Sequence, residues 1–306
     1  MARAVAAWQA EPTVVAVMDA MKRFGRGTSL ERCGPLAALF RANDPAGRTF
    51  ADSFTAAGLA ALDAHPLGQV PVPHGPRRSV PALVMAQAGR ANLALAAYDG
   101  AMLAQMPPPK TADFPPYETW IHVLAGHGEA DLVLCRDLEG GNDNGRVLLQ
   151  SGKVRLEPGV TLYRHGSRET LQVRQASGSL VMLRLQRRFA EPEPVREYSM
   201  PDGTLLHQAA ALEADSRREL ALALLGRMGR RDAVPDMARI VCSDQSRPLR
   251  WEALRQILSL DITAGLALVG QVAADQEDAL SGDARHLQVE LLKTWPDLER
   301  IAPWQS

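Results

Sequence analysis

The chain has 306 residues, enough for one large domain or two ordinary ones, each with its own core. Hydrophobic residues make up 46% and charged residues 23%, which fits a globular protein and excludes a disordered one. The formal net charge of -1 gives no reason to expect nucleic acid or an anionic membrane as the main partner.

The cysteines and the apolar runs of the sequence indicate the cellular compartment of the protein. Cys33, Cys135 and Cys242 lie far apart, form no CxxC pair and are odd in number, so we expect reduced thiols and no disulfide framework. The first residues lack the charged and apolar segments of a signal peptide. No run approaches the roughly 18 apolar residues of a membrane span. These features predict a cytoplasmic protein.

Residues 1–76 are predicted to form an N-terminal helical segment. Apolar residues at three- and four-residue spacing follow Pro12, and Gly25 stands where such a helix would end. Pro35 is suited to the first position of a second helix. A third helix is expected from Thr49 through Leu62.

Residues 77–210 are predicted to be β-structure. Short apolar runs alternate with turn signals such as Gly89-Arg90, Gly126-His127-Gly128, Gly152 and Ser177-Gly178. About nine short strands in regular alternation with turns favour an antiparallel sandwich or barrel over a βαβ sheet.

Residues 211–306 return to a helical period and form the predicted tail. Glu219 and Glu252 begin matching segments about 33 residues apart, a period typical of helical solenoids such as HEAT-like repeats. The apolar stripes that define this pattern include Leu220, Leu224, Leu225 and Met228, then Val234, Met237, Ile240 and Val241, then Leu254, Ile257 and Leu258. So short an array needs a neighbour, so we expect it to dock on the β-region, on a second copy or on a protein partner.

The segment from Tyr117 to Arg188 is similar to the cupin family. The sequence WIHVLAGHGEADL resembles the strand–Gly-x-Gly–strand turn that closes the first cupin motif. Gly152 and Pro158 have the spacing that opens the second motif. The resemblance implies an α+β protein with a cupin-like double-stranded β-helix, or jelly-roll barrel, between the N-terminal helices and the helical tail. It also implies a homodimer, because cupins frequently pair through sheet edges.

The metal ligands that this resemblance implies are missing. The Glu position of the first motif falls on Thr119, with Glu118 one residue away, and Ala112 to Pro115 holds no histidine pair. In the second motif the glycine after Pro158 comes one residue early, and the last histidine ligand maps to Tyr163. Because a divalent metal needs three or four protein ligands, we expect a barrel without metal or other cofactor.

Strand alternation sorts the remaining candidates by face. Thr119 shares a face with Ile121 and Val123, which the resemblance makes the interior, whereas His122 lies on the other face and is expected to pack beneath the helices. Tyr163 takes the interior ligand position and shares its parity with His165. The residues predicted to bind a ligand are Thr119, Tyr163 and His165, and the alternative site contains Glu118 and His122.

Two functions of different class remain open. The favoured one is a metal-free cupin-like module that binds a small molecule or serves as a scaffold, with a helical tail that contacts a partner. The alternative is a cupin-type enzyme. It could be an iron-dependent oxygenase that uses the off-register set Glu118, His122 and His165, or a metal-free isomerase or epimerase with His165 and Tyr163 as base and acid.

Overall fold

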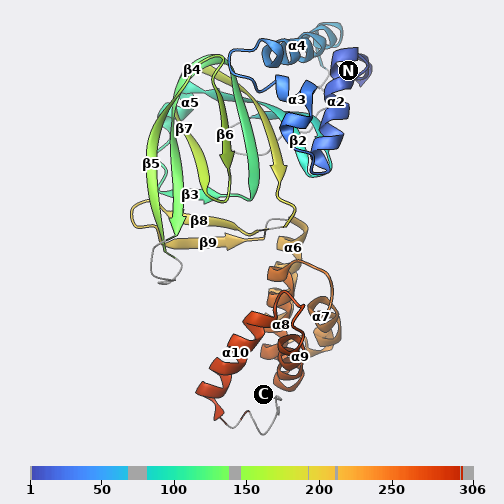
Figure 1. Cartoon of the computed structure of the whole chain (residues 1–306), viewed down its shortest axis with the longest axis vertical. Helices are drawn as coiled ribbons and strands as arrows, with labels where there is room; N and C mark the ends of the chain where they lie inside the picture. Colours follow the sequence, from blue (N-terminus) through green and yellow to red (C-terminus); the bar gives the residue numbers. More distant parts are fainter. Residues whose placement is uncertain are drawn as a thin grey trace. The chain divides into compact units, whose positions relative to one another are not determined.

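The computed structural model describes residues 2–67, 81–137, 146–191, 193–210, 213–296 and 298. It separates into two compact units, Met1–Gln208 and Ala209–Ser306. The first unit contains the N-terminal helices together with the strands, and the second contains the tail helices (Figure 1).

Residues 2–67 of the first unit are helical. They form α1 (Ala2–Gln9), α2 (Pro12–Gly25), a 3-10 turn at Leu30–Arg32, α3 (Gly34–Ala38) and α4 (Ala46–Ala64). The predicted start of α2 at its proline and its end at Gly25 are confirmed. Pro35 lies in the first turn of α3, as expected, although α3 is only five residues long.

The strands form two antiparallel sheets. The larger has the order β1-β2-β7-β4-β5, with β6 paired to β4, and the smaller has the order β3-β8-β9. The predicted hairpin across Gly89-Arg90 is confirmed, because β1 and β2 flank it. The strands are β1 (Ala82–Ala88), β2 (Ala91–Asp99), β3 (Thr111–Phe114), β4 (Tyr117–Asp137), β5 (Val147–Leu156), β6 (Thr161–His165), β7 (Glu169–Arg188), β8 (Val195–Ser199) and β9 (Leu205–Ala209), with the short helix α5 (Gly100–Gln105) after β2.

Two of the predicted turns are bends within long strands. Gly126 and Gly178 have positive φ values of 82° and 72°, yet they lie inside β4 and β7, which run through 21 and 20 residues. The pairing of β4 with β7 shifts register beside Gly126, as at a β-bulge. The prediction that Gly126-His127-Gly128 separates two strands is therefore wrong, because glycine lets the strand bend without leaving the sheet.

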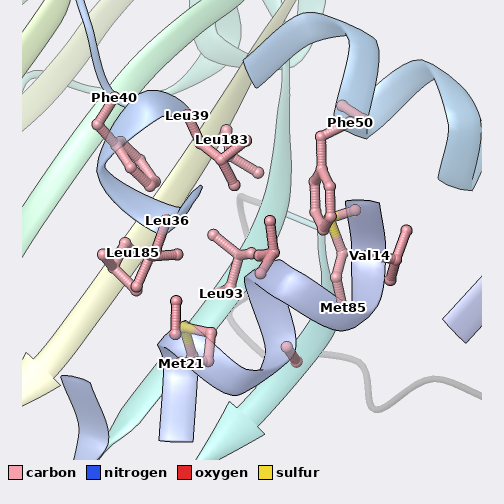
Figure 2. Close-up of a cluster of buried hydrophobic side chains, with 14 of the residues drawn as sticks. Val14, Met21, Leu36, Leu39, Phe40, Phe50, Met85, Leu93, Leu183 and Leu185 are labelled. Carbon is pink, nitrogen blue, oxygen red and sulfur yellow. The ribbon is translucent and has the colours of Figure 1, made fainter. Parts of the chain in front are cut away.

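The larger sheet has an outer face that the helices cover. Leu93, Leu183 and Leu185 of β2 and β7 are fully buried and pack in one cluster with Leu36 of α3 and Phe50 of α4 (Figure 2). Figure 1 shows α2, α3 and α4 on this outer side of the curved strands. The helices and the sheet thus share one hydrophobic core, the main source of their mutual stability.

The inner face of the sheet carries a second core. Ile121 and Val123 of β4 pack with Leu180 and Met182 of β7 and with Leu156 of β5. A third cluster lies farther along β4 and β5, where Val133 and Val147 pack with Phe114 of β3 and Tyr198 of β8. This contact holds the small sheet against the large one.

The second unit is a bundle of helices around its own core. It contains α6 (Glu213–Arg227), a 3-10 turn at Arg231–Ala233, α7 (Val234–Val241), α8 (Arg247–Leu260), α9 (Ile262–Ala274) and α10 (Ser281–Thr294). The expected burial of Leu254 and Ile257 is confirmed. The HEAT-like repeat and the partner of the tail stay predictions.

The predicted stripe on α6 is wrong. Leu220, Leu224 and Met228 have 73%, 57% and 58% of their surface exposed, whereas Leu222 is buried in the core of the second unit. The sequence ELALALLGRM carries apolar residues on several sides of the helix, so a helical period fits more than one face. The packing partner α8 decides which face is buried.

Gly25 provides a test of how closely α2 approaches the β1–β2 hairpin. A Cβ atom added there would lie 2.0 Å from the backbone oxygen of Ala88, which cannot move aside like a side chain. Gly25→Ala should therefore destabilise the protein by about 1–3 kcal/mol, measured by chemical denaturation. Gly34→Ala is the matched control, because a Cβ at Gly34 meets nothing within 4 Å. Equal stability of the two variants would show that α2 does not pack this closely.

Two leucines of α6 test the core of the second unit. Leu222→Ala should lower the melting temperature of the tail helices and reduce their free energy of unfolding by about 2–5 kcal/mol, because Leu222 is buried, with 4% of its surface exposed. Leu220→Ala, two residues away and 73% exposed, should leave the melting temperature of these helices nearly unchanged. Circular dichroism of the full chain measures both. The opposite ranking would reinstate the face predicted from the sequence.

Candidate functional site

A row of polar side chains crosses five strands on the inner face of the large sheet. Cross-strand partners share a face, and the pairing runs from Gln87 to Asn92, then to Gln186, Thr119 and Arg164. These residues come from β1, β2, β7, β4 and β6 in that order. We call the inner-facing positions of these strand segments the inner wall.

The next row of the inner wall is apolar except for one arginine. Ala94, Arg184, Ile121 and Leu162 are cross-strand partners on β2, β7, β4 and β6. Beyond Ile121 the inner face belongs to the apolar core around Val123. The inner wall therefore changes from polar to apolar along the strands, as ligand sites commonly do.

The two arginines of these rows lie on either side of β4. Arg164 is opposite Thr119 on β6, and Arg184 is opposite Ile121 on β7. Two strand spacings and two residues of rise separate them, which places their Cα atoms about 12 Å apart. Both are long side chains on the same face of a curved sheet, with Thr119 between them.

Hydrogen bonds within the polar row orient its groups. Thr119 is fully buried, and its Oγ1 accepts a hydrogen bond of 3.4 Å from Nε2 of Gln186. Nη1 of Arg164 donates to the backbone oxygen of Glu169 at 3.1 Å. Because Thr119 accepts from Gln186, its own O–H can serve as a donor. The predicted interior position of Thr119 is confirmed, and its role in ligand binding stays a prediction.

The predicted interior position of Tyr163 is wrong. Tyr163 pairs with Trp120 on the outer face, its ring centroid is 5.0 Å from that of Trp120, and 51% of its surface is exposed. His165 lies on the same outer face, opposite Glu118, with its ring 4.4 Å from that of Phe189. The sequence could have revealed this shift, because the glycine after Pro158 comes one residue earlier than in the motif. A shift of one residue exchanges the faces, so Arg164 takes the inner position.

The environment of Tyr163 also argues against an acid–base role. Partial burial, and next the negative charge of Glu118, raise the pKa of Tyr163 above its usual value near ten. The phenol therefore stays protonated across neutral pH and is a weak proton donor there. A Tyr163–His165 acid–base pair would moreover lie on the outer face, away from the inner wall.

Glu118 of the alternative site is part of an ion pair that holds α2. Its carboxylate lies 2.6 Å from Nη2 of Arg187, and both side chains are mostly buried. Nη1 of Arg187 donates to the backbone oxygens of Phe24, in the last turn of α2, and of Thr28, just after that helix. The guanidinium also lies 4.1 Å from the centre of the Phe24 ring, a cation–π contact. Glu118 and Arg187 thus fasten the helical layer to the sheet.

His122 lies beneath the helices, as strand alternation predicts. It is 2% exposed, and its Nδ1 lies 2.7 Å from the backbone oxygen of Leu39. Gly47 of α4 approaches the imidazole so closely that an added Cβ would lie 2.5 Å from Nδ1. His122 therefore has a packing position in the core between α3, α4 and β4.

The residues present do not fit a divalent metal. His122 is four residues from Glu118 along β4, about 13 Å away, so the off-register set does not converge on one ion. The polar row offers a hydroxyl, amides and a guanidinium, and a guanidinium repels a cation. Across the described ranges no group of three His, Cys, Asp or Glu residues could hold a metal.

A scan of protein families finds no match to this sequence, and no curated protein matches it. Solved structures are similar over part of the chain. A putative mannose-6-phosphate isomerase from Ralstonia eutropha JMP134 is 17% identical, with a TM-score of 0.25, and the match covers 40% of this chain and 94% of that one. A cupin superfamily protein from Desulfitobacterium hafniense DCB-2 is 18% identical, with a TM-score of 0.23, covering 38% and 83%. Hydroxypropylphosphonic acid epoxidase from S. wedmorenis is 11% identical, with a TM-score of 0.27, covering 40% and 58%.

Likeness at these TM-scores carries no information about activity or ligand. In the part of the chain that the structure describes, no helix has both the length and the apolar character needed to cross a membrane.

The ion pair between Glu118 and Arg187 can be tested by a double-mutant cycle. Arg187→Met should cost about 3 kcal/mol of unfolding free energy, because it leaves the Glu118 carboxylate mostly buried without its partner. The double variant Glu118→Gln/Arg187→Met should recover part of that loss. The exposed pair Lys22–Asp19, treated in the same way, should show a coupling below about 1 kcal/mol. Equal couplings for the two pairs would contradict a fastening role.

Proposed function

We propose that the first unit is a metal-independent, cupin-like module that binds a small molecule at its inner wall. The polar row from Gln87 to Arg164 is the observation that carries this proposal, because it places hydrogen-bonding groups of five strands on one face. The two antiparallel sheets, joined by the contacts of Val133 and Val147 with Phe114 and Tyr198, support the fold part of the proposal.

The polar row supports binding more strongly than catalysis. Its side chains are amides, a hydroxyl and a guanidinium, none of which exchanges protons readily near neutral pH. General acid–base catalysis needs a group whose pKa lies near the working pH. Among the inner-wall residues that the register defines on β1, β2, β4, β6 and β7, none is a histidine, aspartate or glutamate. Orientation of a ligand by hydrogen bonds is the chemistry that these groups can perform.

The apolar row beside the polar one supports a ligand of mixed character. Ile121 and Leu162 would contact the carbon skeleton, and Thr119 with Gln186 would contact polar substituents. Ligand sites are commonly apolar with a few polar groups that set orientation. An amphipathic metabolite fits this wall better than a sugar polymer or a purely apolar compound.

Thermal-shift screening with a metabolite library tests the proposal on the full chain. A ligand that binds the folded state should raise the melting temperature. Thr119→Val removes the hydroxyl with little change of volume and should abolish most of the shift, as should Gln186→Leu. His165→Ala, on the outer face, should leave the shift intact. Addition of a chelator should not change it.

The same variants also show which face of the large sheet binds the ligand. A shift that is lost in His165→Ala and kept in Thr119→Val would move the site to the outer face. A shift that requires iron or another metal would favour the cupin-type oxygenase. A protein that binds no member of the library through Thr119 or Gln186 would leave a scaffold role and contradict the binding proposal.

A further inference from the structure

The helix α6 of the second unit carries three large apolar side chains on its exposed side. Leu220, Leu224 and Met228 follow one another at four-residue spacing, so they form one straight row along about two turns of the helix. They have 73%, 57% and 58% of their surface exposed. We call these three residues the exposed stripe. Single exposed leucines are common on protein surfaces, whereas a contiguous apolar row indicates an interaction site.

The two carboxylates of α6 whose side chains the structure describes face α8. Asp215 is buried, and its Oδ2 accepts a hydrogen bond from the hydroxyl of Ser246, just before α8. Burial, and next the charges of Asp215 and of Glu252 on α8, raise the pKa of Glu219, so Glu219 also lies beside α8. The negative charge of these two residues is therefore on the side of α6 that packs within the second unit, away from the exposed stripe.

Arginines gather at the end of the exposed stripe that Met228 occupies. Arg227 comes three residues after Leu224, so it lies on the same side of α6, and Arg230 and Arg231 follow the end of the helix. Arg230 is paired with Asp232. Arg227 and Arg231 are exposed, and among the residues that the structure describes neither of them forms an ion pair. The exposed stripe therefore ends in a net positive charge.

The shape and charge of this surface favour an acidic helix as its occupant. A row of side chains at four-residue spacing forms a ridge that fits the groove of a second helix. A second copy of this chain would bring no complementary charge to the stripe. Within α6, the positions three and four residues from the stripe residues hold no carboxylate; they are Ser216, Arg217, Ala221, Ala223, Leu225 and Arg227. The stripe also contains no tryptophan or phenylalanine, which helices at a membrane surface typically present.

We propose that the exposed stripe docks an acidic amphipathic helix of a protein partner. The apolar side of that helix covers Leu220, Leu224 and Met228, and its carboxylates pair with Arg227 and Arg231. Apolar anchors that recur every three or four residues are a common way in which a helix is recognised. Ion pairs at the edge of such a contact add specificity and speed the association. The inference concerns the second unit and does not depend on ligand binding by the first.

Two synthetic peptides test this inference by calorimetric titration into the full chain. Both are amphipathic helices with the same leucine stripe; one carries glutamates at the positions beside the leucines, and the other carries lysines there. We expect the glutamate peptide to bind, with an affinity that added salt weakens. The lysine peptide should bind roughly tenfold more weakly or worse, because its charges meet Arg227 and Arg231. Equal binding of the two peptides, or binding of neither, would contradict the inference.

Variants connect the binding to the exposed stripe. Leu224→Ser and Arg227→Glu should each weaken the binding of the glutamate peptide roughly tenfold or more. Val289→Ser is the matched control for the first, because Val289 is an apolar residue of α10 with 61% of its surface exposed. Arg32→Glu, which makes the same change of charge at an exposed position of the first unit, is the control for the second. Arg227→Glu should also strengthen the binding of the lysine peptide, a reversal that loss of folding cannot produce.

Other occupants of the stripe would give different results, each of which overturns the inference. A chain that is dimeric by light scattering and becomes monomeric in Leu224→Ser would assign the stripe to a second copy. Binding to phosphatidylserine vesicles that is lost in Leu224→Ser would assign it to a membrane surface. A melting temperature that Leu224→Ser lowers in the absence of peptide would show that another part of this chain covers the stripe.

Discussion

The register of β4 with its neighbours is the constraint on which the first unit depends. β4 pairs with β7 on one side and with β6 on the other over the same residues, so each side chain of its first half belongs to a row across the sheet. Odd positions such as Thr119 and Ile121 face inward, and even positions such as Trp120 and His122 face the helices. A shift of one residue would place Thr119 under the helices and His122 on the inner wall. The cores on the two faces prevent this, because Leu124 of β4 must remain buried beneath the helices and Val123 in the inner core.

The charged residues on the two faces of the large sheet have different surroundings. Arg187 and Glu118 lie on the outer face, where their ion pair and the backbone oxygens of Phe24 and Thr28 hold the helical layer in position. Arg164 and Arg184 lie on the inner face, where the neighbouring positions are apolar or neutral. The same residue type therefore fastens the helical layer on one side and lines the inner wall on the other. The distinction follows from alternation along β6 and β7 and from what each row places opposite the arginine.

Much of the architecture can be predicted from the sequence. The boundaries of α2, the β1–β2 hairpin and the inward parity of Thr119 follow from local rules on proline, glycine and strand alternation. The bends at Gly126 and Gly178 could not be distinguished from turns, because the same left-handed glycine serves both. Whether a strand continues past a glycine or ends there depends on its pairing with strands far away in the sequence. The prediction that Leu220, Leu224 and Met228 form the buried face of α6 is wrong for a related reason. The leucines of α6 lie on several sides of the helix, and only packing against α8 selects Leu222 for burial.

The site was predicted less well than the fold. The faces on which Thr119 and His122 lie follow correctly from the sequence, because both residues belong to a long strand with strong apolar alternation. Parity on β6 was assigned from the alignment of a distant motif, and the early glycine after Pro158 moved the strand by one residue. That single step replaces Tyr163 on the inner wall with Arg164. Propensity and periodicity within the five residues of β6 do not identify Arg164; the sequence signal is the early glycine after Pro158, and the pairing with Thr119 makes the arginine a candidate.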